Sequence, residues 1–261
     1  LIGATSGRTT LNGEGLQHQD GHSHILSSTI PNCLSYDPAY AYEVAVIVKD
    51  GIKKMYVDQE NYFYYITTIN ENYSHPEMPD GAEDGIIKGM HRIKKVDKPN
   101  VRLIGSGAIL NESIKASEIL KQYDIDSEVW SVTSFNLLRK NGMEIERLNQ
   151  LNPLDEKKLT YVEECFIDND IPTIAATDYM RAYAEQIRPY IRCQYLTLGT
   201  DGYGRSDSRK TLRDFFEVDS ESITRSAIYL LFQENYLSED QIKKIYKDLR
   251  IDPNKPNPWE V

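Results

Sequence analysis

From residue 101 onward, segments typical of buried strands alternate with segments typical of helices. Runs rich in β-branched and apolar residues cover 101–106, 128–132, 171–176 and 195–198. Helical patterns cover 112–123, 135–140, a segment after Asp178, and then 209–216, 220–234 and 238–249. Regular alternation of this kind predicts an α/β fold in which helices pack on a mostly parallel sheet.

Several helix ends in this part are marked by their local chemistry. Asp178 and Asp207 are expected to be N-caps, and Ser238 with Gln241 forms the pattern of a capping box. Asn141 and Gly142 are expected to end the short helix 135–140, because both residues favour helix C-termini.

The first part of the chain predicts a smaller strand and helix unit. Strands are expected at 32–36 and 62–69, and Asp37 followed by Pro38 predicts a helix over 38–57. Prolines and glycines then interrupt every pattern between residues 70 and 100. We therefore expect residues 1–75 to form one part, 76–100 to be a linker, and 101–261 to be a C-terminal α/β domain.

Charge and composition exclude some partners. The formal net charge is −10 and the sequence pI is about 5.1, which argues against nucleic acid or an anionic membrane as the main partner. No apolar run reaches the ~20 residues that a membrane helix needs. The three cysteines are widely spaced, so a reducing cytoplasm is expected. Most of the 18 tyrosines are expected in the core or in a subunit interface.

Residues 7–28, GRTTLNGEGLQHQDGHSHILSS, are expected to line a functional site. The segment combines flexible glycines with a dense group of titratable side chains. These side chains are Glu14, His18, Asp20, His22 and His24. If the segment is a strand, His22 and His24 share a face and could bind a metal, as in a metal-dependent hydrolase that also uses His18 and Asp20. Two other interpretations stay open: a histidine acts as acid or base with Glu14 beside it, or these are ordinary polar loop residues.

The loop 199–209, GTDGYGRSDSR, follows the last predicted strand. Loops at the carboxyl ends of parallel strands often build sites. This one matches neither the phosphate loop nor the dinucleotide pattern GxGxxG. The sequence leaves open whether it binds a ligand or supports the structure.

Long strings in the chain resemble one enzyme family. They are GATSGRTTLNGEGLQHQDGHSHILSSTIPN, YEVAVIVKDG, YYITTINENY, SVTSF, ATDYMRAYAEQIRPY and LGTDGYGRSDSRKTLRDFFEVD. Together they resemble the C-terminal third of the homodimeric bacterial pyruvate dehydrogenases, the thiamine diphosphate-dependent first component of the pyruvate dehydrogenase complex. The resemblance implies a transketolase-like architecture. Residues 1–75 would end the middle, pyrimidine-binding domain, and 101–261 would be the transketolase C-terminal-like domain.

The resemblance also implies a reaction and its residues. Members of the family decarboxylate pyruvate on thiamine diphosphate with Mg²⁺ and reductively acetylate lipoyl groups on a dihydrolipoyl acetyltransferase core. Glu14 and His18 would be catalytic, with His22, His24 and Asp20 in support. The Gly-Asp-Gly motif that holds metal and diphosphate in the family has no counterpart here, so no residue of this chain is assigned to cofactor or metal. We therefore expect an inactive fragment of a homodimer that binds no cofactor alone, or a non-catalytic dimerisation module.

Overall fold

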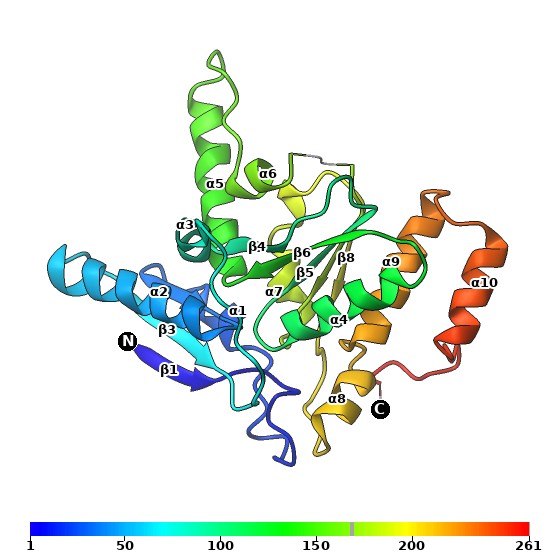
Figure 1. Cartoon of the computed structure of the whole chain (residues 1–261). Helices are drawn as coiled ribbons and strands as arrows, with labels where there is room; N and C mark the ends of the chain where they lie inside the picture. Colours follow the sequence, from blue (N-terminus) through cyan, green and yellow to red (C-terminus); the bar gives the residue numbers. More distant parts are fainter. Residues whose placement is uncertain (168–169, 261) are drawn as a thin grey trace.

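The structure is a computed structural model that describes residues 1–167 and 170–260, and it contains two β-sheets (Figure 1). The smaller sheet has the order β1-β3-β2 and is parallel throughout. Its strands are β1 (Ile2–Thr5), β2 (Cys33–Tyr36) and β3 (Phe63–Thr68). The strands expected at 32–36 and 62–69 are confirmed.

The larger sheet has the order β4-β6-β5-β7-β8. Its strands are β4 (Met90–Lys94), β5 (Val101–Gly105), β6 (Ser127–Val132), β7 (Thr173–Ala176) and β8 (Tyr195–Leu198). The edge strand β4 runs antiparallel to β6, and the other neighbours are parallel. The expectation of an α/β fold with a mostly parallel sheet is confirmed, as are the four strands predicted after residue 100.

Helices cover both faces of the larger sheet because successive strand residues point to opposite faces. Leu103 of β5 packs with α4 (Ile109–Lys121) and α9 (Ser220–Gln233). Its neighbour Ile104 packs on the other face with residues of α5, α6 and α7. These three helices are α5 (Phe135–Leu151), α6 (Tyr161–Cys165) and α7 (Arg181–Glu185), and the 3-10 turn η2 (Arg188–Tyr190) follows α7. Helix α8 (Arg209–Phe215) precedes α9, and α10 (Glu239–Asp248) follows it. Ser238 forms the expected capping box at the start of α10.

The smaller sheet is covered by α2 (Ala41–Ile52), which continues as the π-helical turn η1 (Lys53–Val57). The prediction that Asp37 caps this helix is wrong, because the helix begins at Ala41. Asp37 is fully buried and accepts hydrogen bonds from Ser6 and Thr67 instead. Glu43 accepts hydrogen bonds from the main-chain N–H groups just before the helix.

Much of the segment 76–100, which the sequence predicted to be a linker, forms regular structure. Helix α3 (Ala82–Lys88) lies between Gly81 and Gly89, which have φ angles of 74° and 117°. Strand β4 follows directly and joins the larger sheet. The glycines therefore set the ends of a helix, a use of positive φ that composition alone does not distinguish from a flexible linker.

Three other predicted helix ends are wrong. Helix α5 continues to Leu151 because Gly142 allows close contact with Tyr190: a Cβ at residue 142 would lie 2.1 Å from the ring carbon Cζ. Met180, not Asp178, precedes α7, and Ser208, not Asp207, caps α8.

Among residues 1–167 and 170–260, no helix combines the length and apolar character required to span a bilayer.

Candidate functional site

The segment 7–28 connects β1 to β2 and lies against the loops that follow β7 and β8. Asp178, just after β7, is fully buried and accepts hydrogen bonds from Thr9 N at 2.9 Å and from Thr10 Oγ1 at 2.8 Å. Burial raises the pKa of the Asp178 carboxyl, while the Arg213 charge and these hydrogen bonds oppose the rise. Asp178 therefore joins the two sheet units rather than capping a helix.

Glu14 and His18 are brought together by the turn between them. The Nδ1 atom of His18 lies 2.9 Å from Glu14 Oε2, and the side chains are 57% and 46% exposed. With Glu14 ionised, its carboxylate accepts from Nδ1–H, which leaves Nε2 with no partner among residues 1–167 and 170–260. The pair can therefore offer an imidazole nitrogen to a ligand for proton transfer.

Asp20 organises the start of a short helix, α1 (Ser23–Ser27). Its Oδ1 accepts hydrogen bonds from His22 N at 2.9 Å and Ser23 N at 3.0 Å. His22 is exposed, and its Nδ1 lies 3.4 Å from Nη2 of Arg8. The expectation that His22 and His24 share the face of a strand is wrong, because His22 precedes a helix and His24 lies within it.

His24 belongs to the core. Its ring is fully buried, stacks on Tyr183 at a centroid distance of 4.8 Å and meets the edge of Tyr179 at 4.6 Å. Nε2 lies 3.1 Å from Thr67 Oγ1, which itself donates to Asp37 Oδ1 at 2.8 Å. Burial lowers the pKa of His24 to about 3, so the ring is neutral at neutral pH and donates through Nε2–H.

These positions do not assemble the metal site considered for a hydrolase. The ring of His24 is enclosed by aromatic side chains, whereas His18 and His22 are exposed and Asp20 is engaged with the start of α1. Within the part of the chain that the structure describes, no group of three His, Cys, Asp or Glu side chains is placed to hold a metal ion. The four proposed ligands are thus divided between core and surface.

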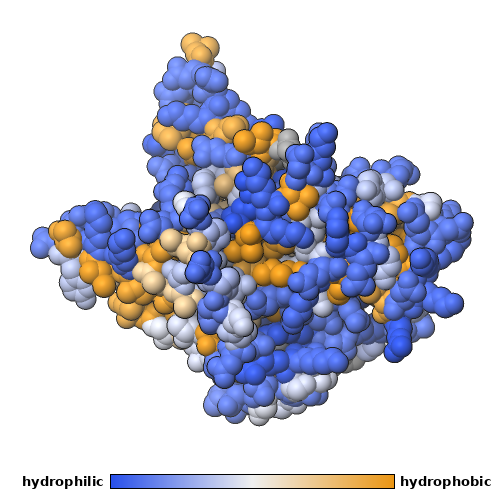
Figure 2. Space-filling view, in the orientation of Figure 1, coloured by the Kyte–Doolittle hydropathy of each residue, from blue (hydrophilic) through white to orange (hydrophobic). Residues whose placement is uncertain are grey.

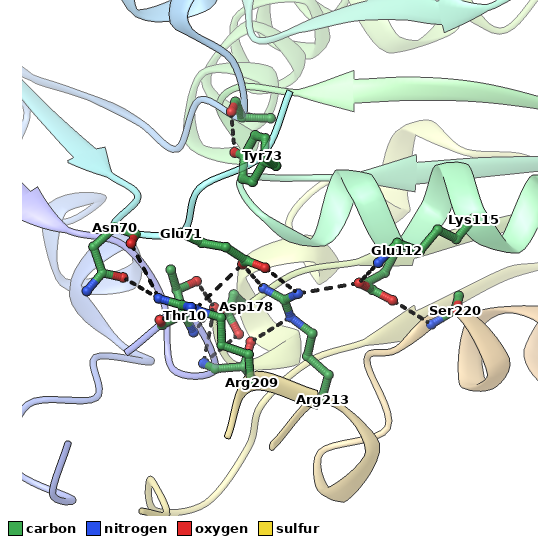
Figure 3. Close-up of polar contacts among 12 residues, drawn as sticks. Thr10, Asn70, Glu71, Tyr73, Glu112, Lys115, Asp178, Arg209, Arg213 and Ser220 are labelled. Carbon is green, nitrogen blue, oxygen red and sulfur yellow. Dashed lines mark hydrogen bonds and ion pairs between the residues drawn. The ribbon is translucent and has the colours of Figure 1, made fainter. Parts of the chain in front are cut away.

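A cluster formed by Arg209 and Arg213 lies beside the segment 7–28 and was not recognised from the sequence. Arg213 is 6% exposed, and its Nη1 lies 3.2 Å from Glu71 Oε1 and 3.4 Å from Glu112 Oε1. Figure 3 shows Arg213 between these two carboxylates, with Asp178 and Arg209 close by. The three arginines in GRSDSRKTLR were the available signal, but nothing in that string identifies their carboxylate partners.

Two family models match the chain. The model described as the pyruvate dehydrogenase E1 component middle domain matches residues 1–76. The model described as the transketolase-like C-terminal domain matches residues 89–219. Residues 7–28 lie in the first of these and the loop 199–209 in the second, so the contacts described above join the two matched regions.

Curated relatives and solved structures agree with these matches. The chain is 56% identical over 263 residues to the pyruvate dehydrogenase E1 component of Buchnera aphidicola subsp. Acyrthosiphon pisum and 52% identical over 263 residues to that of Escherichia coli. Each alignment covers 99% of the chain but 29% of the relative, so the chain spans about three tenths of their length. A transketolase mutant from Pichia stipitis shares the fold, with a TM-score of 0.64, 15% identity, and coverage of 89% of this chain and 30% of that one.

Proposed function

Because the chain belongs to the family of pyruvate dehydrogenase E1 components, we propose that it supplies one wall of a site that decarboxylates pyruvate and reductively acetylates lipoyl groups. The observation that carries this proposal is the exposed pair of Glu14 and His18, joined at 2.9 Å in the segment that matches the family's middle domain. Residues 1–75 would form the end of that domain, and residues 101–261 the C-terminal domain.

The proposed chemistry assigns proton handling to His18. Glu14 accepts a hydrogen bond from Nδ1 and fixes the tautomer, so that Nε2 is available to take or deliver a proton at the substrate. Thiamine diphosphate, when bound, supplies the electron sink for the decarboxylation. His22 and Asp20 would act in support through the start of α1. His24, also expected to support the site, would do so as a neutral core residue beneath it.

Residues outside this chain would be needed to complete the cofactor-binding site. The chain spans about three tenths of the length of its relatives, and the residues that hold Mg²⁺ are proposed to lie in the rest of the whole protein. We propose that thiamine diphosphate and Mg²⁺ bind there and that this chain alone neither holds them nor turns over pyruvate. A homodimer in the cytoplasm, bound to a dihydrolipoyl acetyltransferase core, is the proposed setting.

An exposed apolar surface supports the proposal of a subunit or domain interface. Ile52, Tyr56 and Val57, at the end of α2 and in η1, are 52%, 74% and 71% exposed. In Figure 2, hydrophobic side chains gather over this end of the molecule. Clusters of this kind on otherwise polar proteins commonly mark contact surfaces. The same surface would serve the alternative of a non-catalytic dimerisation module.

The test uses the full-length protein and the substitution His18→Ala. We expect turnover of pyruvate to fall by about 10²-fold or more, the usual range for losing an acid–base group, with little change in cofactor affinity. Leu154→Ala serves as a control, because that side chain is 98% exposed in the loop after α5. Unchanged turnover of the His18 variant would contradict the assigned role. In calorimetry, micromolar binding of thiamine diphosphate with Mg²⁺ to the isolated chain would show that the cofactor site is misplaced.

A further inference from the structure

The loop 199–209, which we call the glycine loop, lies along the segment that carries Glu14 and His18. In Figure 1 the coil between β1 and α1 passes beside the chain that leads from β8 into α8. Arg209 Nε donates to Thr10 O at 2.8 Å, and Gly13 N donates to Asp207 O at 3.0 Å. The glycine loop is therefore in direct contact with the turn that presents the proposed catalytic pair.

Arg8 connects the beginning of the segment to the glycine loop. The side chain is 2% exposed, and its Nη1 donates to Thr200 O at 2.5 Å and also to Gly202 O. A buried guanidinium that donates to two main-chain carbonyls of the loop fixes the path of the loop rather than offering a charge to a ligand. This arrangement favours the supporting role for the glycine loop over the ligand-binding role that the sequence left open.

Gln19 makes a second connection, directly after His18. The residue is 4% exposed, and its Nε2 donates to Leu11 O at 2.9 Å. Its Oε1 accepts a hydrogen bond from Arg205 N at 2.6 Å. The side-chain amide of Gln19 therefore joins both ends of the turn that carries Glu14 and His18, and it connects that turn to the glycine loop.

Ser206 makes a third connection, on Glu14 itself. Its hydroxyl donates to the main-chain oxygen of Glu14 at 2.5 Å. Since Gly13 N also donates to Asp207 O, the backbone on both sides of the Glu14 side chain is bonded to the glycine loop, while the carboxylate is paired with His18. An exposed ion pair on a free loop is too weak to order that loop alone. Ordering the loop costs conformational entropy, which the hydrogen bonds from the glycine loop and Gln19 must offset.

We propose that the glycine loop positions the Glu14–His18 pair for catalysis, and that Gln19 and Ser206 are its positioning residues. This rests on the proposed function. Neither residue needs to touch substrate. Each holds the backbone that sets where the imidazole lies, and a misplacement of about 1 Å in such a group costs on the order of 10²-fold in rate.

The test compares variants of the full-length enzyme. Gln19→Leu keeps the size of the side chain and removes both hydrogen bonds, so kcat should fall about tenfold or more while KM for pyruvate and cofactor affinity stay nearly constant. Ser206→Ala should lower kcat by less, and Ser206→Thr, which keeps the hydroxyl, should restore it. Thr29→Ala is the matched control, because its hydroxyl donates locally, to Leu26 O at 2.7 Å in the turn after α1.

A second measurement is independent of activity. Amide hydrogen exchange of residues 13–18 in the 261-residue chain should accelerate in Gln19→Leu while the strands of both sheets keep their protection. Unchanged exchange there, or an unchanged kcat in an active enzyme, would overturn the positioning role. If the wild-type enzyme does not turn over pyruvate, the proposed function fails, and exchange at residues 13–18 still decides whether the glycine loop orders the turn.

Discussion

Two buried groups on either side of Thr67 should give the folding stability opposite dependences on pH. His24 and Asp37 are both fully buried and linked through the Thr67 hydroxyl. Burial lowers the pKa of His24 from 6.5 to about 3, whereas burial raises the pKa of Asp37 from 3.8 to about 7, partly opposed by its hydrogen bonds to Thr67 and Ser6. Each shift is a statement about stability, because the unfolded chain has ordinary values.

The sign differs between the two groups. Below pH 6.5 the unfolded state binds a proton at His24 that the folded state refuses, so acidification destabilises the fold. Between pH 3.8 and about 7 the folded state binds the extra proton at Asp37, so acidification stabilises it. On going from about pH 7.5 to about pH 5.5, His24 should remove about 1.4 kcal/mol and Asp37 should add about 2 kcal/mol.

Because the two contributions nearly cancel, the informative quantity is the difference between each variant and the wild type. His24→Gln keeps a neutral donor for Thr67 but does not titrate. It should be less stable than wild type at about pH 7.5 and recover about 1.4 kcal/mol of that deficit at about pH 5.5. Asp37→Asn should show the opposite, losing about 2 kcal/mol relative to wild type over the same interval.

The assay is urea unfolding at the two pH values, followed by circular dichroism. Tyr183→Phe is the control, because it removes a hydroxyl from the same buried cluster without removing a group that titrates in this interval. Its stability difference from wild type should be equal at both pH values. If wild type and His24→Gln change in parallel on acidification, His24 titrates normally in the folded protein. Burial would then not lower the pKa of His24.

Two further substitutions test packing and the arginine cluster, both by urea unfolding. Gly142→Ala should destabilise α5 by about 1–3 kcal/mol although alanine is the better helix former, because its Cβ would meet the Tyr190 ring; with Tyr190→Ala the same change should be tolerated. Arg213→Met should cost about 3–5 kcal/mol because Glu71 and Glu112 lose their buried partner, and Arg213→Lys should recover part of it. A loss of stability below about 1 kcal/mol in Gly142→Ala or in Arg213→Met would contradict the prediction for that residue.

The candidate site was only partly determined by sequence. The sequence placed Glu14 and His18 in one segment and the resemblance gave both a catalytic role, whereas their contact at 2.9 Å depends on the turn between them. His24 occurs in the same short string, yet its ring is buried against Tyr179 and Tyr183, which lie more than 150 positions along the chain. Which histidines are exposed is therefore decided by packing.

The sequence by itself determined the order of β2, α2 and β3 and the alternation of strands and helices after residue 100, because β-branched runs and apolar periodicity are local properties of the chain. It did not predict β1, α3 or β4. Only the tertiary structure decided how the polar residues at their ends are used. Asp37 and Asp178 have the chemistry of helix caps, but burial between the two sheet units directs them to Thr67, Thr9 and Thr10. A carboxylate removed from water must find donors wherever the fold supplies them, and that requirement outweighs a local capping preference.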